Sequence, residues 1–177
     1  MKNIILFLFS IVFVSCSNDK PVETKSALFI EEKLNNFIAD NPDWTKDEAT
    51  ETATTDKFKR QAIKWSNEPS FLNDMPLQLK RIADTTESGQ AVKMAHFKTF
   101  NDKNRPAGSL LNYINLHIKG IVSDEQAKQL QIDKNYNLIG NLQRQGKRAD
   151  VKFIKVSDFK GYDIGSYTFV ITGFKPL

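Results

Sequence analysis

The chain has 177 residues, of which 40% are hydrophobic and 26% are charged, and its formal net charge at pH 7 is +4. A chain of this size buries enough apolar surface for one domain without disulfides, and so small a charge does not require a nucleic-acid partner. The single cysteine excludes an internal disulfide and a zinc site built from several cysteines.

Residues 1–15 have the features of an export signal in the expected order. Lys2 precedes an apolar run from Ile4 to Val14, which only Ser10 interrupts. At about 1.5 Å per residue, this run is too short for a hydrocarbon core of about 30 Å. We therefore interpret residues 1–15 as a signal peptide that is removed, with a buried N-terminal strand or core helix as the alternative.

The cysteine follows this run in the segment Phe13-Val14-Ser15-Cys16. The segment resembles the lipobox of bacterial lipoproteins, in which a small residue precedes an obligatory cysteine, although Phe13 stands where leucine is usual. The resemblance implies that Cys16 is acylated and becomes the mature N-terminus. Because two or more acyl chains give stable anchoring, the expected location is a membrane, namely the periplasmic or surface face of an outer membrane. The acidic Asp19 is similar to export signals in lipoproteins of the Bacteroidota.

Residues 16–25 form a polar stretch with one proline and no aromatic residue. This composition is typical of a flexible tether. Residues 26–177 are expected to fold as a single globular domain, with helices over 26–68 and strands over 75–175.

Residues 26–68 predict two amphipathic helices in a hairpin. The first stops before Pro42, because a proline disfavours helical geometry at the residue before it. A capping-box pattern formed by Thr45 and Glu48 predicts the start of the second, which runs to about Ser66. We interpret Trp44 as a residue that fixes the elbow between the helices, rather than as a platform for a ligand. The buried faces are predicted to carry Ala27, Ile30, Leu34, Phe37 and Ile38 on the first helix, and Phe58, Ala62 and Trp65 on the second.

Apolar and polar residues alternate after Pro69, which predicts strands. Segments rich in turn-forming residues, at 84–89, 101–108, 145–150 and 158–165, separate several of them and are short enough for antiparallel pairing. One helix interrupts the strands, and the capping box from Ser123 to Gln126 marks its start. The predicted strands cover 76–83, 91–100, 111–122, 136–144, 150–157 and 166–174.

Glycines lie inside three of these strands, at Gly120, Gly140 and Gly173. A glycine inside a strand usually marks a bulge, a bend or a close backbone approach, and repeated bends suit a small barrel. The order of three strands, one helix and further strands resembles an OB-fold in topology. The predicted fold class is α+β, with the helical hairpin packed on a small antiparallel OB-like β-barrel. The alternative is a curved open sheet packed on the hairpin, as in cystatin-like domains.

The sequence lacks the GxSxG, HExxH, Walker and GxGxxG patterns of common enzyme sites. The acidic pairs Asp47/Glu48 and Asp124/Glu125 coincide with predicted helix starts, where carboxylates complement free backbone amides. We therefore expect a protein that is not an enzyme and that needs no cofactor.

The two histidines, His96 and His117, are candidate metal ligands. His96 shares the parity of Val92 and Met94 and is assigned to the apolar face, as a half-buried side chain. His117 is assigned to the polar face. The histidines are therefore expected to point to different sides of the sheet, and no metal site is predicted.

A basic cluster surrounds the predicted hairpin at 144–155, beside an aromatic residue. On an OB-like barrel, such a cluster can bind single-stranded nucleic acid or oligosaccharide, but it can also be a charged edge that prevents strand pairing. The leading hypothesis is a lipid-anchored, non-catalytic envelope or cell-surface protein that binds a protein or glycan partner. The alternative is binding of single-stranded nucleic acid or another anionic polymer through this hairpin. The possible ligand-binding residues are Arg144, Lys147, Arg148, Lys152, Phe153 and Lys155.

Overall fold

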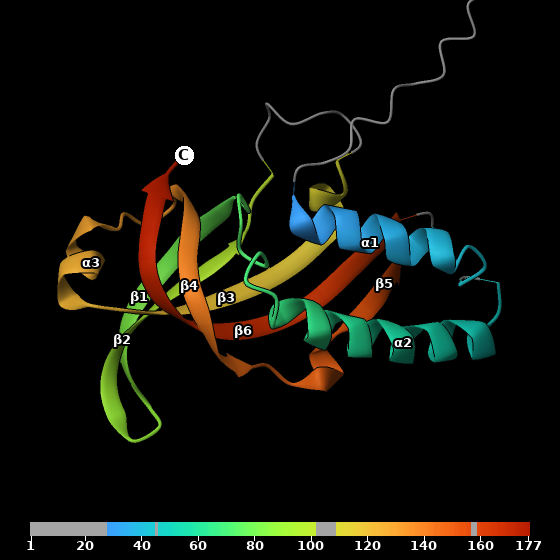
Figure 1. The fold of residues 1–177 in the computed structure, drawn as a ribbon, viewed down its shortest axis with the longest axis horizontal. Coiled ribbons are helices and arrows are strands. Elements are labelled where there is room, and N and C mark those ends of the chain that lie inside the picture. Colours follow the sequence, from blue (N-terminus) through green and yellow to red (C-terminus); the bar gives the residue numbers. More distant parts are fainter. Residues whose placement is uncertain (1–27, 45, 102–108, 157–158) are drawn as a thin grey trace, which may run out of the picture.

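A computed structural model describes residues 28–44, 46–101, 109–156 and 159–177. Cys16, together with the predicted signal peptide and tether, lies outside the described residues. Within them, the fold is α+β, with a six-stranded, mostly antiparallel sheet and few helices, as shown in Figure 1.

The elements follow the predicted order along the chain. Five strands agree with the predicted ranges to within a few residues, and only the last begins much earlier than expected. The helices are α1 (Phe29–Asp40), α2 (Glu48–Ser66) and α3 (Asp124–Gln129), with short 3-10 helices η1 (Leu110–Tyr113) and η2 (Arg148–Asp150). The strands are β1 (Leu77–Glu87), β2 (Gln90–Thr99), β3 (Ile114–Val122), β4 (Asn135–Gln145), β5 (Lys152–Val156) and β6 (Phe159–Pro176).

The start of α2 differs from the prediction. Asp47 is the N-cap residue, and its carboxylate accepts a hydrogen bond from the backbone amide of Thr50 at 2.7 Å. This hydrogen bond holds the pKa of Asp47 below its usual value. The predicted capping box that started from Thr45 is therefore wrong, because Asp47 already supplies the side-chain acceptor that the first turn needs. Thr45 itself lies outside the described residues.

The strands pair in the order β3-β2-β1-β4-β6-β5, and β3 also pairs with β6. The β3–β6 pairing is parallel, whereas the other neighbouring strands are antiparallel. Strand β6 can serve three neighbours because it has 18 residues: its first part pairs with β5, its middle with β3 and its last part with β4.

Strand β6 begins at Phe159, so the predicted turn at 158–165 is wrong. The residues that resembled a turn form an irregularity inside the strand. Gly165 has a φ of +93°, its backbone amide donates to the Asp163 carboxylate at 3.0 Å, and the pairing with β3 shifts register beside Asn115. Asp and Gly thus serve a bulge-like distortion here rather than a chain reversal.

The glycine prediction is confirmed, by close approach at Gly120 and Gly140 and by a register irregularity beside Gly173, where Ile139 pairs with Gly173 but Gly140 pairs with Ile171. A Cβ on Gly120 would lie 2.7 Å from the Ile171 side chain, and a Cβ on Gly140 would lie 2.6 Å from the Val170 carbonyl oxygen. Both strands therefore approach β6 more closely than a larger residue allows. At Gly173 the nearest atom would be 3.8 Å away, which is ordinary contact.

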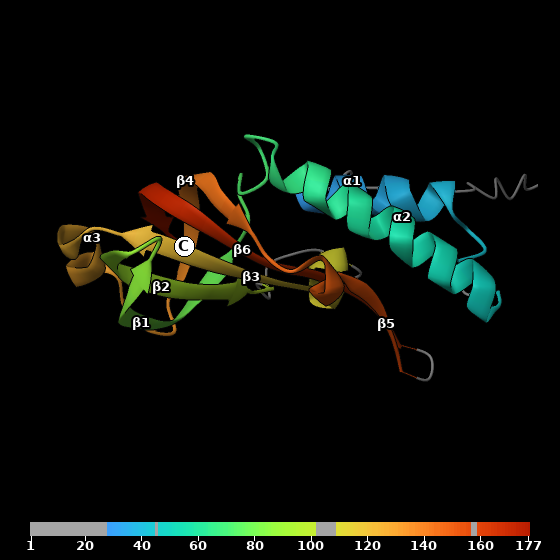
Figure 2. The same cartoon turned by 90° about the horizontal axis from the view of Figure 1, so that it is seen from below.

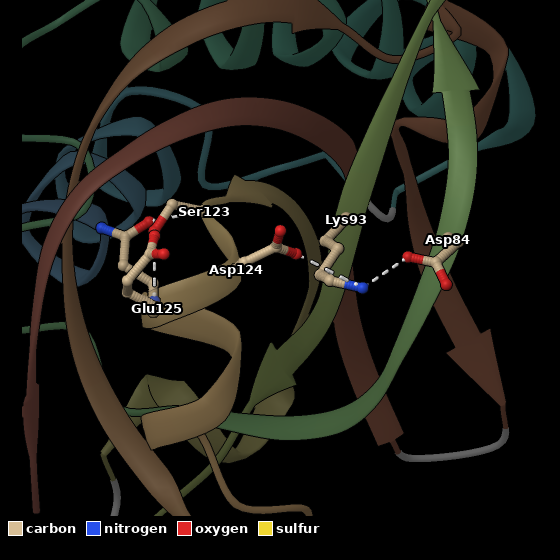
Figure 3. Close-up of polar contacts among 6 residues, drawn as sticks. Asp84, Lys93, Ser123, Asp124 and Glu125 are labelled. Atoms are coloured by element: carbon tan, nitrogen blue, oxygen red, sulfur yellow. Dashed lines mark hydrogen bonds and ion pairs between the residues drawn. The ribbon is translucent and has the colours of Figure 1, made fainter.

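Helix α3 has the predicted capping box. The Ser123 hydroxyl accepts from the Gln126 amide at 3.2 Å, and the Gln126 side chain accepts from the Ser123 amide at 2.9 Å. Figure 3 shows Lys93 of β2 between Asp84 of β1, at 2.8 Å, and Asp124 of α3, at 3.5 Å. Lys93 therefore links this helix to the β1–β2 hairpin.

Helices α1 and α2 pack over the end of the sheet formed by β5 and β6, whereas α3 lies at the opposite end (Figure 2). Trp44, in the connection between the helices, is buried and stacks on Phe153 of β5 with ring centroids 4.2 Å apart. Its predicted role at the elbow is therefore confirmed. The aromatic cluster that joins the helices to the strands consists of Phe37, Trp44, Phe58, Trp65, Phe153 and Tyr162.

Candidate ligand-binding face

The basic hairpin does not form the combination of free cations and an aromatic platform that its sequence suggested. Arg144 is paired with Glu87 of β1, with Nε 3.0 Å from one carboxylate oxygen and Nη2 3.1 Å from the other. The Arg144 charge is therefore neutralised within the protein.

Phe153 is 8% exposed and lies in the aromatic cluster, where it stacks on Phe58 as well as on Trp44. Its ring therefore has no free face for a ligand. Lys147, Arg148 and Lys152 are exposed. Lys155 belongs to β5, and its side chain lies outside the described part of the chain.

The two histidines lie on the same face of the sheet, so the prediction that they point to different sides is wrong. His96 pairs with Lys119, and Lys98 pairs with His117, across the antiparallel β2–β3 ladder. Directly opposed residues, and residues two apart on one strand, share a face. The residues of β2 that point into the core are Ala95 and Phe97, the neighbours of His96. His96 is half-buried, as predicted, but from the outer side.

A third strand extends this face. Arg81 of β1 pairs with His96, which places its side chain beside the imidazole. We call the resulting surface the strand face. It combines exposed and half-buried groups: Arg81, Lys98 and His117 are exposed, while His96 and Lys119 are half-buried. The strand face is defined by Arg81, His96, Lys98, His117 and Lys119.

The positive charges of the strand face are not neutralised by ion pairs. No carboxylate of the described residues lies within 4.0 Å of the cationic groups of Arg81, Lys98 or Lys119. Other cations of the same strands are paired, as shown by Lys80 with Asp133 at 3.0 Å and by Lys93 with two aspartates.

Burial first, and the surrounding positive charge next, lower the pKa values of both histidines. Burial lowers the pKa of His96, and Arg81, Lys119 and His117 lower it further. Burial also lowers the pKa of His117, as do Lys98 and Lys119, while Asp163 of β6 acts in the opposite direction. A bound anion would reverse the unfavourable cationic field and favour imidazolium, which donates hydrogen bonds from both ring nitrogens.

The face is suited to binding oxyanions. Lysine and arginine offer several hydrogen-bond donors, and charge-assisted hydrogen bonds to carboxylate, sulfate or phosphate are the stronger ones. The described residues contain no group of three or more His, Cys, Asp or Glu side chains placed to hold a metal ion. Among the helices that the structure describes, none has the length and apolar character needed to cross a membrane.

Comparisons with protein-family models, with curated proteins and with solved structures find no match for this chain. Sequence reasoning missed the strand face because Arg81, Lys98 and Lys119 are spread over 39 positions of the chain, from 81 to 119. The available signal was the alternation of basic and apolar residues on adjacent strands. Only the register between those strands shows that the basic residues lie together on one face.

Proposed function

We propose that the protein is a lipid-anchored, non-catalytic binding protein of the cell envelope, and that it binds an acidic glycan through the strand face. The observation that carries the proposal is the register of β1, β2 and β3. This register gathers two imidazoles and three cations on one outward surface, and none of these cations forms an ion pair with a carboxylate of the described residues.

The strands are further proposed to form an OB-like barrel. Two observations support this part: the pairing runs from β3 through β2, β1, β4 and β6 and then returns to β3, and that last pairing is parallel. Helix α3 connects β3 to β4, which is the position of the helix in OB-folds. The outer surface of the second and third strands is where OB-folds bind oligosaccharides and oligonucleotides, and the strand face includes that surface.

An acidic glycan fits the chemistry better than a single-stranded nucleic acid. Proteins that bind single strands gain about 1–3 kcal/mol per base from stacking on aromatic rings. The ring that could have served this purpose in the basic hairpin, Phe153, is buried, and the strand face itself has no aromatic member. Export through the proposed lipobox also favours glycans, because these are the common polymers outside the cell.

The anchor is tested separately from the binding. Mass spectrometry of the membrane fraction is expected to find acyl chains on Cys16, and Cys16→Ala is expected to accumulate as an unprocessed precursor. A mature protein that keeps its initiator methionine and fractionates without membranes would contradict the anchor.

Binding is tested with the full-length protein in detergent and immobilised polygalacturonate, with neutral dextran as the comparison polymer. Binding to polygalacturonate and not to dextran is expected, with an affinity that falls as salt rises. Because a charge-assisted hydrogen bond contributes about 1.5–3 kcal/mol, Arg81→Gln is expected to weaken binding by about tenfold or more.

Lys80→Gln is the matched control for Arg81→Gln. It removes one positive charge from the same strand, but Lys80 already pairs with Asp133 and does not belong to the strand face. Equal losses of affinity in the two variants would show that only the net charge of the protein matters, and would contradict the strand face as the binding site.

The nucleic-acid alternative makes a different prediction in the same assay. If it holds, the protein binds an oligothymidylate more tightly than polygalacturonate. The affinity for the oligothymidylate then falls when Lys147, Arg148 and Lys152 are changed together to Gln. These three exposed cations are what favours it. Insensitivity of oligothymidylate binding to this triple variant would eliminate the alternative.

A further inference from the structure

A groove with a volume of about 340 Å³ lies between α1 and α2, away from the strand face. Its floor includes Phe37 of α1, which also packs on Phe58 of α2 in the aromatic cluster. Small-molecule sites in proteins typically have volumes of about 300–1,000 Å³. The groove is therefore large enough for a ligand of the size of one sugar unit.

One wall of the groove is a row of positive charges on α2. Lys57, Arg60 and Lys64 line it, and all three are exposed. Their spacing of three, four and seven residues places them on one side of the helix. None of them has a carboxylate of the described residues within 4.0 Å, whereas Lys59 of the same helix pairs with Asp56 at 3.7 Å.

This row is unfavourable in the free protein. Like charges three or four residues apart on a helix repel one another and destabilise it. A bound anion would remove that repulsion. Arginine adds a planar fork of donors that matches two oxygens of a carboxylate or phosphate.

The remaining lining residues offer acceptors. Asp40 is exposed at the end of α1. Asn41 donates its side-chain amide to the Phe37 carbonyl at 2.8 Å, which leaves its amide oxygen as the group that can accept from a ligand. Gln61 lines the groove between the cations. A ligand with hydroxyl groups can donate to Asp40 and Asn41.

We infer that the groove between α1 and α2 binds an oxyanion carried by a hydroxylated group, such as a carboxylated or phosphorylated sugar. Arg60 and its lysine neighbours hold the oxyanion, and Asp40 accepts from a hydroxyl. The site shares no residue with the strand face, so it goes beyond the function proposed above and does not depend on it. A unit of an acidic glycan and an inositol phosphate headgroup of a lipid share this chemistry.

The test is a titration of the ¹⁵N-labelled full-length protein in micelles, followed by NMR. The probes are glucuronate, glycerophosphoinositol and inorganic phosphate, with glucose as the uncharged comparison. Shifts are expected at the amides of residues 37–41 and 57–64 with the charged probes and not with glucose. Shifts confined to β1, β2 and β3, or equal shifts with glucose, would overturn the site. Tighter binding of glucuronate identifies a glycan as the source, and tighter binding of glycerophosphoinositol identifies a lipid headgroup.

Two variants assign roles within the groove. Arg60→Gln is expected to weaken the binding of glucuronate by about tenfold or more. Lys59→Gln removes the same charge from the same helix outside the groove, and it is expected to leave the affinity for glucuronate unchanged. Asp40→Asn is expected to weaken the binding of glucuronate but not the binding of inorganic phosphate, because phosphate carries no sugar hydroxyl. Equal effects of Arg60→Gln and Lys59→Gln, or of Asp40→Asn on both probes, would contradict the assignment. All three substituted side chains are at least partly exposed, so matching thermal midpoints will establish that the variants are folded.

Discussion

His96 of β2 stands directly opposite Lys119 of β3, and Arg81 of β1 stands on its other side. A titratable imidazole is thus held between two cations on neighbouring strands. His117 lies one position further along the same face, opposite Lys98. The cations of the strand face therefore add to the lowering of both histidine pKa values that burial causes.

The first prediction concerns stability and pH. Both histidine pKa values are lowered in the folded protein, by burial first and by nearby cations next. Below the ordinary value of about 6.5, the unfolded chain therefore binds more protons than the folded one. The neutral histidines therefore contribute to the free energy of unfolding. This contribution is fully present above about pH 6.5, and it is lost as the pH falls from there through the pKa values of the folded protein.

Chemical denaturation at pH 7.5 and pH 5.5 checks this prediction. The wild type is expected to be less stable at pH 5.5, and the variant with His96→Gln and His117→Gln is expected to lose less. An equal decrease in both proteins would show that other groups cause the pH dependence.

The second prediction concerns binding and pH, and it has the opposite sign. An anion on the strand face favours the protonated imidazoles, so affinity for a polyanion is expected to rise between pH 7.5 and pH 5.5. The upper limit is about tenfold per pH unit for each proton taken up. Dextran sulfate is the suitable probe, because its own charge does not change in this range.

Replacement of both histidines by Gln is expected to flatten this pH profile while leaving measurable binding through Arg81, Lys98 and Lys119. A profile that keeps its slope in the double variant would rule out the histidines as the groups that take up the protons.

The third prediction concerns Phe153, which joins β5 to the helices through stacking on Trp44 and Phe58. Phe153→Ala is expected to lower the free energy of unfolding by about 3–5 kcal/mol, because it opens a cavity between the two layers. Urea denaturation measures this loss. Lys152→Gln, at the exposed neighbouring position, is the control and is expected to change stability by less than about 0.5 kcal/mol. A small loss for Phe153→Ala would mean that the helices do not depend on this contact.

The fourth prediction concerns Glu31 of α1, which is 1% exposed. Its carboxylate accepts from the Leu111 amide at 2.9 Å and from the Ser109 hydroxyl, and so ties α1 to η1. Glu31→Ala is expected to cost about 1–3 kcal/mol, because the buried Leu111 amide loses the closer of its two acceptors and keeps only the Ser109 hydroxyl at 3.3 Å. Glu31→Gln keeps an acceptor oxygen and is expected to cost less. Thermal unfolding of both variants measures the difference, and equal losses would show that the charge rather than the acceptor matters.

The sequence predicted the local elements well because each depends on nearby residues. The alternation at Ile114, Leu116 and Ile118 marked β3, and the capping residues Ser123 and Gln126 marked α3. The start of β6 was missed because Asp163 and Gly165 have turn chemistry, and only pairing with β3 identifies them as part of a strand.

The candidate site was harder to predict, since it depends on which face of each strand is buried. In β2, apolar residues occupy both parities: Val92 and Met94 alternate with Ala95 and Phe97. The sequence gives no reason to prefer the second pair as the core, and the wrong choice placed His96 on the inner side. The ion pair between Arg144 and Glu87 was equally hard to predict, because the two residues are 57 positions apart in the sequence.

The fifth prediction uses two glycines of neighbouring strands as a matched pair. Gly140→Ala would place a methyl group 2.6 Å from the Val170 carbonyl oxygen, which belongs to the backbone and cannot rotate away. Overpacking of this kind costs about 1–3 kcal/mol. Gly173→Ala introduces the same methyl group where the nearest atom is 3.8 Å away, and Gly173 has no positive φ. We expect Gly173→Ala to be tolerated or slightly stabilising, because alanine reduces the conformational freedom of the unfolded chain. Urea denaturation of both variants measures the difference, and a Gly140→Ala protein as stable as the wild type would contradict the close packing of β4 against β6.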